Sequence, residues 1–247
     1  MTATPRLLVI QHELDDPLGE LGGPLVDAGL EPVPWFTPAS AVPPVDLEDL
    51  DGIVSMGAIC GVLQEAEHPW MPRERELVTA ALERELPVLG VCFGAQLLAS
   101  CAGARVWKSG HPEVGWCDVT ATAEGLDDRI TGGLGETYRA MQYHHDTFEL
   151  PSGATLLARN GDTVEAYRLG ERAWGLQYHV EVNPAMAYGW LASYREDMLP
   201  HLDLDAFHLE TRAFWRAYRD RCVAVGTAFA QVVHEHAAHR SGGPAPA

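Results

Sequence analysis

The residues with the strongest chemical signal surround Cys92, within residues 89–96 (LGVCFGAQ). A short apolar run that predicts a buried strand ends at Cys92, and a helical pattern begins directly after it. This order is typical of a nucleophile elbow, the tight strand-to-helix turn that presents a nucleophile. Gly90 and Gly94 suit the close backbone packing of such a turn, and a helix amino terminus favours the thiolate form of a cysteine. The segment therefore indicates a reactive cysteine; a buried structural cysteine is the simpler alternative.

A histidine and a glutamate two residues apart could activate that thiol. Residues 174–178 alternate like a strand that delivers His179 at its end, and Glu181 follows. A thiol nucleophile needs a base to take its proton, and the base needs a carboxylate that holds its tautomer and orientation. Taken alone, His179 is more often a polar surface histidine. Together with an elbow cysteine, the pattern predicts that Cys92, His179 and Glu181 act as nucleophile, base and orienting acid.

The elements that must position these residues alternate between strand and helix through the first hundred residues. Strands are predicted at 6–11, 32–36, 52–55 and 87–91, and helices at 17–29, 73–85 and 95–100. Such alternation is typical of a parallel sheet covered by helices on both faces. Further strands are predicted at 114–122, 138–143, 154–158, 163–168 and 173–178, which could extend the same sheet as an antiparallel section. We therefore predict an α/β fold with a mostly parallel central sheet.

Two helices are predicted to close the chain. Asn183 and Pro184 form a typical helix start ahead of 185–197. The last helix is predicted over 203–239, with an apolar stripe at helical spacing that favours packing over a partner-binding face. We expect one catalytic domain over 1–200, a helical extension over 201–240 packed on it, and a flexible tail over 241–247.

Composition narrows the classes of partner and cofactor. The 247 residues carry 17 Lys and Arg against 35 Asp and Glu, a net charge of −18, and Lys108 is the only lysine. Such acidity disfavours nucleic acid and anionic membranes, and no apolar run is long enough to span a bilayer. Five cysteines without a C-x-x-C pair predict neither a zinc site nor disulfides, which favours a cytoplasmic location. No metal is expected, and no cofactor either, since nucleotide-binding glycine motifs are missing.

Four segments together resemble the class I (triad) glutamine amidotransferase family. They are residues 90–96 (GVCFGAQ), 113–116 (EVGW), 141–151 (MQYHHDTFELP) and 177–181 (QYHVE). The resemblance extends from residue 7 to about 190, with the motifs in family order. It is strongest for stand-alone members that resemble the amidotransferase half of GMP synthetase, and it implies a flavodoxin-like α/β fold.

The resemblance also implies a mechanism. Cys92 would attack the γ-carboxamide of glutamine or of a γ-glutamyl compound and form a thioester that water hydrolyses. The backbone N–H groups of Phe93 and Gly57 would form the oxyanion hole. By the same resemblance, the substrate would be bound by Gln96, Tyr143, His145 and Asp146.

Two departures from the family pattern lie in the pocket. Met56 and Ala58 flank Gly57 where relatives have a glycine and a proline, although the essential donor maps to Gly57 itself. His145 stands where the family has a glycine, in a position that lines the pocket for the α-amino and α-carboxylate groups. We expect His145 to alter recognition of the glutamyl head.

Three functions compete on these residues. The chain could hydrolyse a γ-glutamyl amide or peptide without a partner, supply ammonia from glutamine to a separate synthetase, or serve as a non-enzymatic binding module. The complete set of Cys92, His179 and Glu181 disfavours the third function. His145 alone is compatible with either of the other two; together with a leaving-group side near Gly57 and Met56 that is not narrowed, it slightly favours the first.

Overall fold

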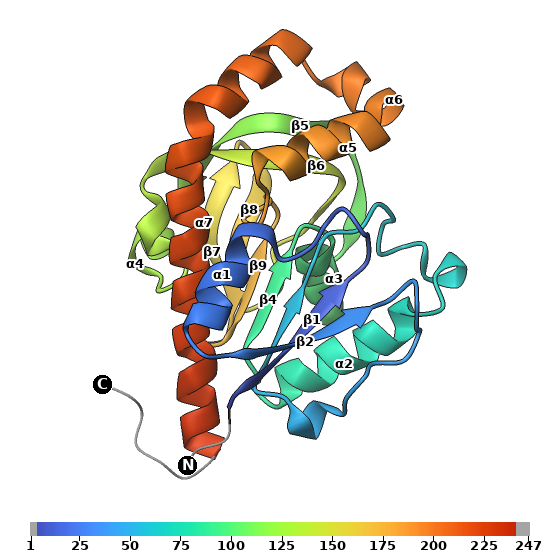
Figure 1. Cartoon of the computed structure of the whole chain (residues 1–247), viewed down its shortest axis with the longest axis vertical. Coiled ribbons are helices and arrows are strands. Elements are labelled where there is room, and N and C mark those ends of the chain that lie inside the picture. The colour runs from blue at the N-terminus through green and yellow to red at the C-terminus, as the bar shows by residue number, and fades with distance from the viewer. Residues whose placement is uncertain (1–3, 241–247) are drawn as a thin grey trace.

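A nine-stranded sheet forms the centre of the computed structural model, which describes residues 4–240 (Figure 1). The predicted tail over 241–247 lies outside the described residues. The strand order is β2-β1-β3-β4-β9-β8-β7-β5-β6. The strands are β1 (Arg6–Gln11), β2 (Glu31–Phe36), β3 (Gly52–Ser55), β4 (Val88–Val91), β5 (Val106–Ala121), β6 (Thr137–Phe148), β7 (Thr155–Asn160), β8 (Thr163–Leu169) and β9 (Ala173–Leu176).

The sheet has a parallel half and an antiparallel half, which corrects the prediction of a mostly parallel sheet. Strands β2, β1, β3, β4 and β9 pair in parallel, whereas β9, β8, β7, β5 and β6 pair antiparallel. The antiparallel half contains the two longest strands, so most of the strand length lies there. After β6 the connections are too short for the crossovers that parallel pairing requires. The predicted antiparallel extension of the same sheet is confirmed, as is the α/β class.

Helices cover both faces of the sheet (Figure 1). Alternate residues of β1 show how one strand serves two cores: Leu7 and Val9 join the core beneath α1 and α7, while Leu8 and Ile10 join the core beneath α2 and α3. The helices are α1 (Gly19–Asp27), α2 (Met71–Glu83), α3 (Phe93–Cys101), α4 (Ala123–Asp127), α5 (Pro184–Ser193), α6 (Arg195–Met198) and α7 (Leu204–Arg240), with short 3-10 turns at η1 (Leu47–Asp49), η2 (Glu65–Glu67), η3 (Gly132–Leu134) and η4 (Leu199–His201).

The long helix α7 packs lengthwise against α1 and the sheet. Its apolar stripe includes Phe207, Tyr218, Cys222 and Phe229, all of which are buried in the same core as the strands. At Gly226 a Cβ atom would overlap Pro24 of α1, so the two helices approach closely. The stripe is therefore packing surface within this chain. The division of the chain at residue 200 stays a prediction.

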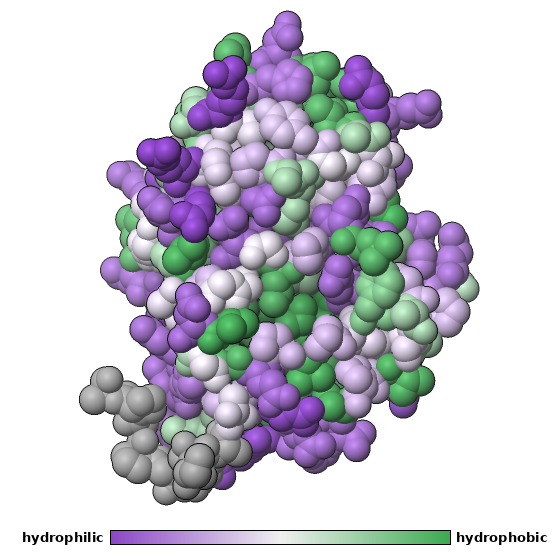
Figure 2. Space-filling view, viewed as in Figure 1, coloured by the Kyte–Doolittle hydropathy of each residue, from purple (hydrophilic) through white to green (hydrophobic). Residues whose placement is uncertain are grey.

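The surface mixes hydrophilic and hydrophobic side chains, as Figure 2 shows for one face. The exposed large apolar residues come from several separate elements, among them Leu14, Leu63 and Leu209. Within residues 4–240, no helix is both long and apolar enough to cross a membrane.

Candidate active site

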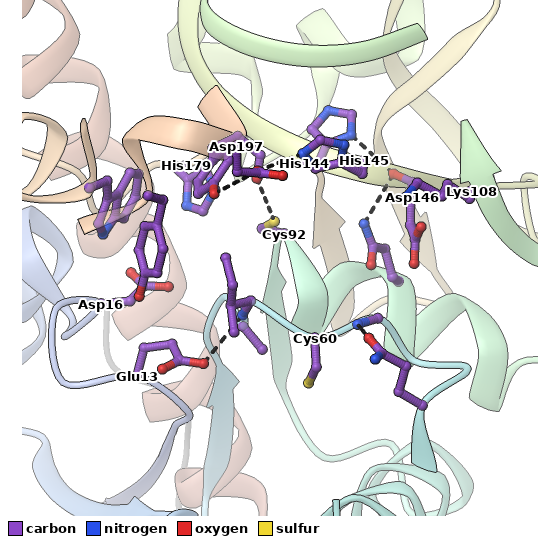
Figure 3. Close-up of a pocket in the computed structure, with 18 of the residues that line it drawn as sticks. Glu13, Asp16, Cys60, Cys92, Lys108, His144, His145, Asp146, His179 and Asp197 are labelled. Atoms are coloured by element: carbon purple, nitrogen blue, oxygen red, sulfur yellow. Dashed lines mark hydrogen bonds and ion pairs between the residues drawn. The ribbon is translucent and has the colours of Figure 1, made fainter. Parts of the chain in front are cut away.

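A cavity of about 600 Å³ opens at the carboxyl ends of the parallel strands. This edge is where open α/β sheets place their ligands. Figure 3 shows Cys92 near the middle of the cavity, with Asp16 and Glu13 on the side of His179 and with Asp146 and Lys108 on the other side. Other residues that line the cavity are Asp15, Gln64, Gln96, Tyr143, His144, His145, Trp190, Tyr194 and Asp197.

Cys92 occupies a strained turn between β4 and α3. Its φ of 50° and ψ of −105° lie in a region that few residues other than glycine adopt. The turn is held by the Cys92 N–H, which donates to Leu176 O at 2.8 Å. A Cβ atom at Gly90 would overlap the backbone of Gly94, and one at Gly94 would overlap Ser55 O. Both glycines are therefore needed for the elbow that the spacing predicted.

The Cys92 thiol is 4% exposed and faces the cavity. Its Sγ lies 3.7 Å from Tyr143 O and 3.8 Å from Gln177 Nε2. Neither the Phe93 nor the Gly57 backbone N–H donates to another residue within 4–240. Neither residue is among those that line the cavity, so their role as oxyanion donors stays a prediction.

His179 follows β9 and stands 3% exposed beside the thiol. Its Nδ1 lies 2.5 Å from Glu181 Oε1, its backbone carbonyl accepts from Tyr218 Oη at 2.7 Å, and its ring packs edge-on against Trp190. Burial lowers the pKa of His179, but the negative charges of Glu181 and Cys92 outweigh burial and raise the pKa well above its ordinary value. The raised pKa makes His179 a stronger acceptor for a proton from the neighbouring thiol.

Three buried side chains that the sequence analysis missed hold the loop around Gly57. His12 Nδ1 lies 3.0 Å from Gly57 O, and His12 Nε2 lies 2.8 Å from Glu74 Oε2. The other oxygen of Glu74 accepts from Ser55 Oγ at 2.6 Å. The His12 ring also packs edge-on against Phe93. This network joins both candidate oxyanion donors, so Met56 and Ala58 leave the Gly57 peptide well supported.

The predicted substrate-binding residues all line the cavity, and their side chains are held by different contacts. Gln96 donates to Asp146 O and to Gln177 Oε1, both at 3.2 Å. The side chain of Asp146 lies against Gly61, where a Cβ atom would overlap its Oδ2. Gln96 therefore ties α3 to the segment that carries Asp146.

His145 and Tyr143 both contact Asp197 of α6. His145 Nε2 lies 2.8 Å from Asp197 Oδ2, and Tyr143 Oη donates to the same oxygen at 2.9 Å. The predicted helix 185–197 breaks at Tyr194 into α5 and α6, and this break brings Asp197 over the cavity. No sequence pattern pointed to Asp197, because a solvated acidic helix end has the same signature.

Of the other four cysteines, Cys60 also lines the cavity and the remaining three do not. Burial raises the pKa of Cys60 and of Cys117 to about 12, and it raises the pKa of Cys101 and Cys222 as well. All five cysteines are free. Near neutral pH these four stay protonated thiols, which are poor nucleophiles.

Two clusters each bring one imidazole nitrogen and two carboxyl oxygens within 4.8 Å of one another. One is Asp16, His179 and Glu181, and the other is Glu113, His144 and Glu165. The first contains the histidine and glutamate beside the thiol. The second lies among β5, β6 and β8, next to the segment that carries His145 and Asp146.

Comparison with known proteins places this geometry in context. A family model for "Glutamine amidotransferase class-I" matches residues 25–187. The chain is 36% identical over 115 residues to a glutamine-hydrolysing GMP synthase of Aeropyrum pernix, covering 46% of this chain and 22% of that protein. It is 32% identical over 146 residues to one subunit of the glutamine-hydrolysing GMP synthase of Halobacterium salinarum, covering 58% of this chain and 72% of that protein.

A crystal structure of a glutamine amidotransferase from Thermotoga maritima has the same fold. The two superpose with a TM-score of 0.83 at 25% identity, covering 94% of this chain and 99% of the other. The chain spans about a quarter of the length of the first GMP synthases that it matches.

Proposed function

This chain belongs to the class-I glutamine amidotransferase family, and on that premise we propose that it hydrolyses the γ-carboxamide of glutamine or of a γ-glutamyl amide. The observation that carries the proposal is the strained turn that sets Cys92 beside the His179–Glu181 pair in an open cavity. Strain of this kind persists only where the surrounding structure maintains it, and it concentrates at functional sites. Cys92 is the proposed nucleophile, His179 the base and Glu181 the acid that orients His179.

The proposed reaction proceeds through a thioester. His179 takes the thiol proton, and the Cys92 sulfur attacks the γ-carbonyl carbon, which places negative charge on the carbonyl oxygen. The N–H groups of Phe93 and Gly57 then stabilise this oxyanion; one such donor contributes about 2.7–4 kcal/mol in other enzymes. When the carbon–nitrogen bond breaks, His179 gives its proton to the leaving amine. Water, deprotonated by His179, then releases glutamate and restores the thiol.

The glutamyl head is proposed to bind at the end of the cavity that contains Asp146 and Lys108 (Figure 3). Asp146 would pair with the α-ammonium group, and the single lysine of the chain would pair with the α-carboxylate. Gln96 shapes this end through its hydrogen bond to Asp146 O, whereas Tyr143 packs against Trp190 and Tyr194. His145 acts through Asp197, which it holds over the cavity by a contact of 2.8 Å between His145 Nε2 and Asp197 Oδ2.

The leaving amine must lie on the other side of Cys92, because His179 protonates it. On that side the cavity is lined by Glu13, Asp15, Trp190 and Tyr194. The cavity volume of about 600 Å³ lies within the range of roughly 300–1,000 Å³ that is typical of small-molecule sites. The cavity is therefore larger than the small glutamyl group alone requires. This surplus favours a γ-glutamyl amide with a larger amine.

A second candidate function is ammonia supply to a separate synthetase. It is supported by the similarity to one subunit of the glutamine-hydrolysing GMP synthase of Halobacterium salinarum, of which this chain covers 72%. In that case free glutamine would be the substrate and the leaving-group side would face the partner.

The test compares kcat/KM for free glutamine with kcat/KM for γ-glutamyl amides and dipeptides. We expect γ-glutamyl amides to be the better substrates for the isolated chain. Cys92→Ala should abolish turnover, and a glutamine-like electrophile should label Cys92 alone. Cys101→Ala, on the same helix but outside the cavity, is the matched control and should keep wild-type activity. Turnover of glutamine alone that rises many-fold with an added synthetase would favour the second function. Activity retained in Cys92→Ala would refute the thioester mechanism, and an inactive wild type would favour a binding module.

A further inference from the structure

Asp16 is a buried carboxyl group that the proposed chemistry leaves without a role. It lies in the loop between β1 and α1 and is 4% exposed. The loop is held to the catalytic region, since Trp190 Nε1 donates to Asp15 O at 3.0 Å and the Glu20 N–H donates to Glu181 O at 2.8 Å. The side chain of Asp16 is therefore fixed in place.

Asp16 faces the acid of the proposed triad. One oxygen of Asp16, one oxygen of Glu181 and one ring nitrogen of His179 lie within 4.8 Å of one another. Asp16 Oδ1 and Glu181 Oε2 are both buried without a hydrogen-bond partner within residues 4–240. Two facing carboxyl oxygens can satisfy each other only when one of them carries a proton.

The charge balance indicates which carboxyl group holds that proton. Within the described part of the chain, neither Asp16 nor Glu181 forms an ion pair with an arginine or lysine. Burial, and after it the charge of Glu181, raise the pKa of Asp16 well above its ordinary value, against a lowering by His179. Glu181 already accepts from His179 at 2.5 Å, whereas the carboxyl oxygen Oδ1 of Asp16 has no hydrogen-bond partner within residues 4–240. The proton therefore belongs on Asp16.

The loop of the candidate oxyanion hole leaves space for this arrangement. A Cβ atom at Gly57 would overlap Asp16 Oδ2 and would press on the His179 ring. The absence of a side chain at Gly57 thus serves Asp16 as well as the oxyanion.

We infer that Asp16 is a positioning residue that, as a neutral acid, donates a hydrogen bond to Glu181 and thereby orients His179. The bond occupies Glu181 Oε2, so that Oε1 accepts the Nδ1 proton and Nε2 points to the Cys92 thiol. A neutral Asp16 also leaves only one negative carboxylate beside the imidazole. Two would hold the imidazolium proton too tightly for transfer to a leaving amine. This inference rests on the proposed function for its kinetic consequence but not for the place of the proton.

The first test is kinetic and uses the full chain with the best γ-glutamyl substrate. Asp16→Ala leaves Glu181 Oε2 unpaired and should lower kcat by roughly 10–100-fold, with a much smaller change in KM. Asp16→Asn keeps a donor for Glu181 and should stay within about three-fold of wild type. Asp27→Asn, an exposed carboxyl group at the end of α1, is the control for loss of charge and should be unchanged.

A pH profile adds a result that a purely structural role would not produce. At alkaline pH the wild type loses the Asp16 proton, and the new charge faces Glu181, His179, Asp15 and Tyr194. Asp16→Asn cannot ionise, so its kcat should persist to higher pH than that of the wild type. Equal alkaline limits in the two proteins would contradict the inference.

A spectroscopic test needs no turnover. Infrared difference spectra of wild type minus Asp16→Asn at neutral pH should show the carbonyl stretch of a protonated carboxylic acid. A carboxylate signal instead would overturn the inference, as would wild-type kcat in Asp16→Ala. If Asp16→Ala fails to fold, Asp16→Asn and the infrared band still decide the matter. If Cys92→Ala abolishes turnover while Asp16→Ala keeps it, only the role of Asp16 fails.

Discussion

Two buried clusters in this molecule contain the same groups, one imidazole between two carboxyls, yet only one of them faces a reactive thiol. In both clusters burial raises the pKa of one carboxyl group well above its ordinary value, that of Asp16 in one and that of Glu165 in the other. The difference lies in what the second nitrogen of each imidazole faces, which is Cys92 for His179 and a carboxylate for His144. His179 commits only Nδ1, to Glu181, and leaves Nε2 without a partner among the described residues.

In the second cluster Nε2 of His144 likewise has no hydrogen-bond partner among the described residues, but it faces a carboxylate. Nδ1 lies 3.0 Å from Asp146 O, and Nε2 lies 3.3 Å from Glu113 Oε2. Glu113 also accepts from Asn160, and Glu165 accepts from Gln142 at 2.6 Å. The network fixes the strand segment that carries Asp146. The comparison teaches that the same groups can serve different purposes: His144 faces a carboxylate and fixes a strand, whereas His179 lies beside the thiol that we propose as the nucleophile.

The largest effect on activity is expected from the cluster that contains His179 and lies beside Cys92. Cys92→Ala and His179→Ala should each lower kcat/KM by roughly 10⁴-fold or more, and the double variant should be hardly worse, because the residues act as a unit. Glu181→Gln should cost less, because the base remains. Steady-state kinetics with a γ-glutamyl substrate measures all four. If the losses of the two single variants add in the double variant, Cys92 and His179 do not act as a unit, and the comparison fails.

An intermediate effect is expected from a third buried imidazole. His12 commits both nitrogens, to Gly57 O and to Glu74, but the peptide that it holds contains a candidate oxyanion donor. His12→Ala should lower kcat by roughly 10-fold, less than deletion of an oxyanion donor itself, and should leave KM nearly unchanged. A change confined to KM would mean that His12 supports substrate binding instead.

A smaller effect on activity, with a larger one on stability, is expected from the occupied cluster. His144→Ala leaves the buried carboxyl of Glu113 short of a partner and should lower the free energy of unfolding by about 1–3 kcal/mol. The kcat of the folded variant should fall less than roughly 10-fold. Urea unfolding and kinetics on the same samples separate the two quantities. A loss of kcat as large as that of His179→Ala would erase the distinction between the clusters.

The smallest effect is on stability, whose dependence on pH should have opposite signs at Asp16 and at Glu113. Folding raises the pKa of Asp16, so the folded wild type keeps a proton that the unfolded chain releases above its ordinary pKa of about 3.9, and stability falls as pH rises. Asp16→Asn should therefore gain stability over wild type from about pH 4 upward.

Glu113 should show the opposite trend. Burial alone would raise the pKa of Glu113, but the hydrogen bonds from His144 and Asn160 and the charge of His144 hold it below the ordinary value. Its stabilisation is present above about pH 4.3 and is lost as pH falls. The advantage of wild type over Glu113→Gln should therefore shrink toward acid. Thermal unfolding between pH 3 and 8, chosen to bracket these ordinary pKa values, measures both differences, and the same sign in both variants would contradict the assignment.

Local spacing determined much of the proposed site. The two glycines around Cys92 predict the elbow because each residue of a tight turn is constrained by its immediate neighbours, and the structure places Cys92 in that strained turn. His179 and Glu181 are two residues apart at a strand end, so a short turn suffices to bring them together. The helix-and-strand alternation up to residue 100 follows from hydrophobic periodicity in the same way.

Only the tertiary structure decided how distant segments meet. The antiparallel half depends on strand pairing, which the periodicity of single strands does not specify. Asp16 reaches Glu181 from a loop 165 residues earlier in the chain, and Asp197 reaches His145 because the last helices fold back over the cavity. In the sequence both acids look like solvated carboxylates. Asp16 is distinguished by burial and the loss of water, whereas Asp197 stays exposed and is distinguished by its contacts with His145 and Tyr143; both arise only when the segments pack.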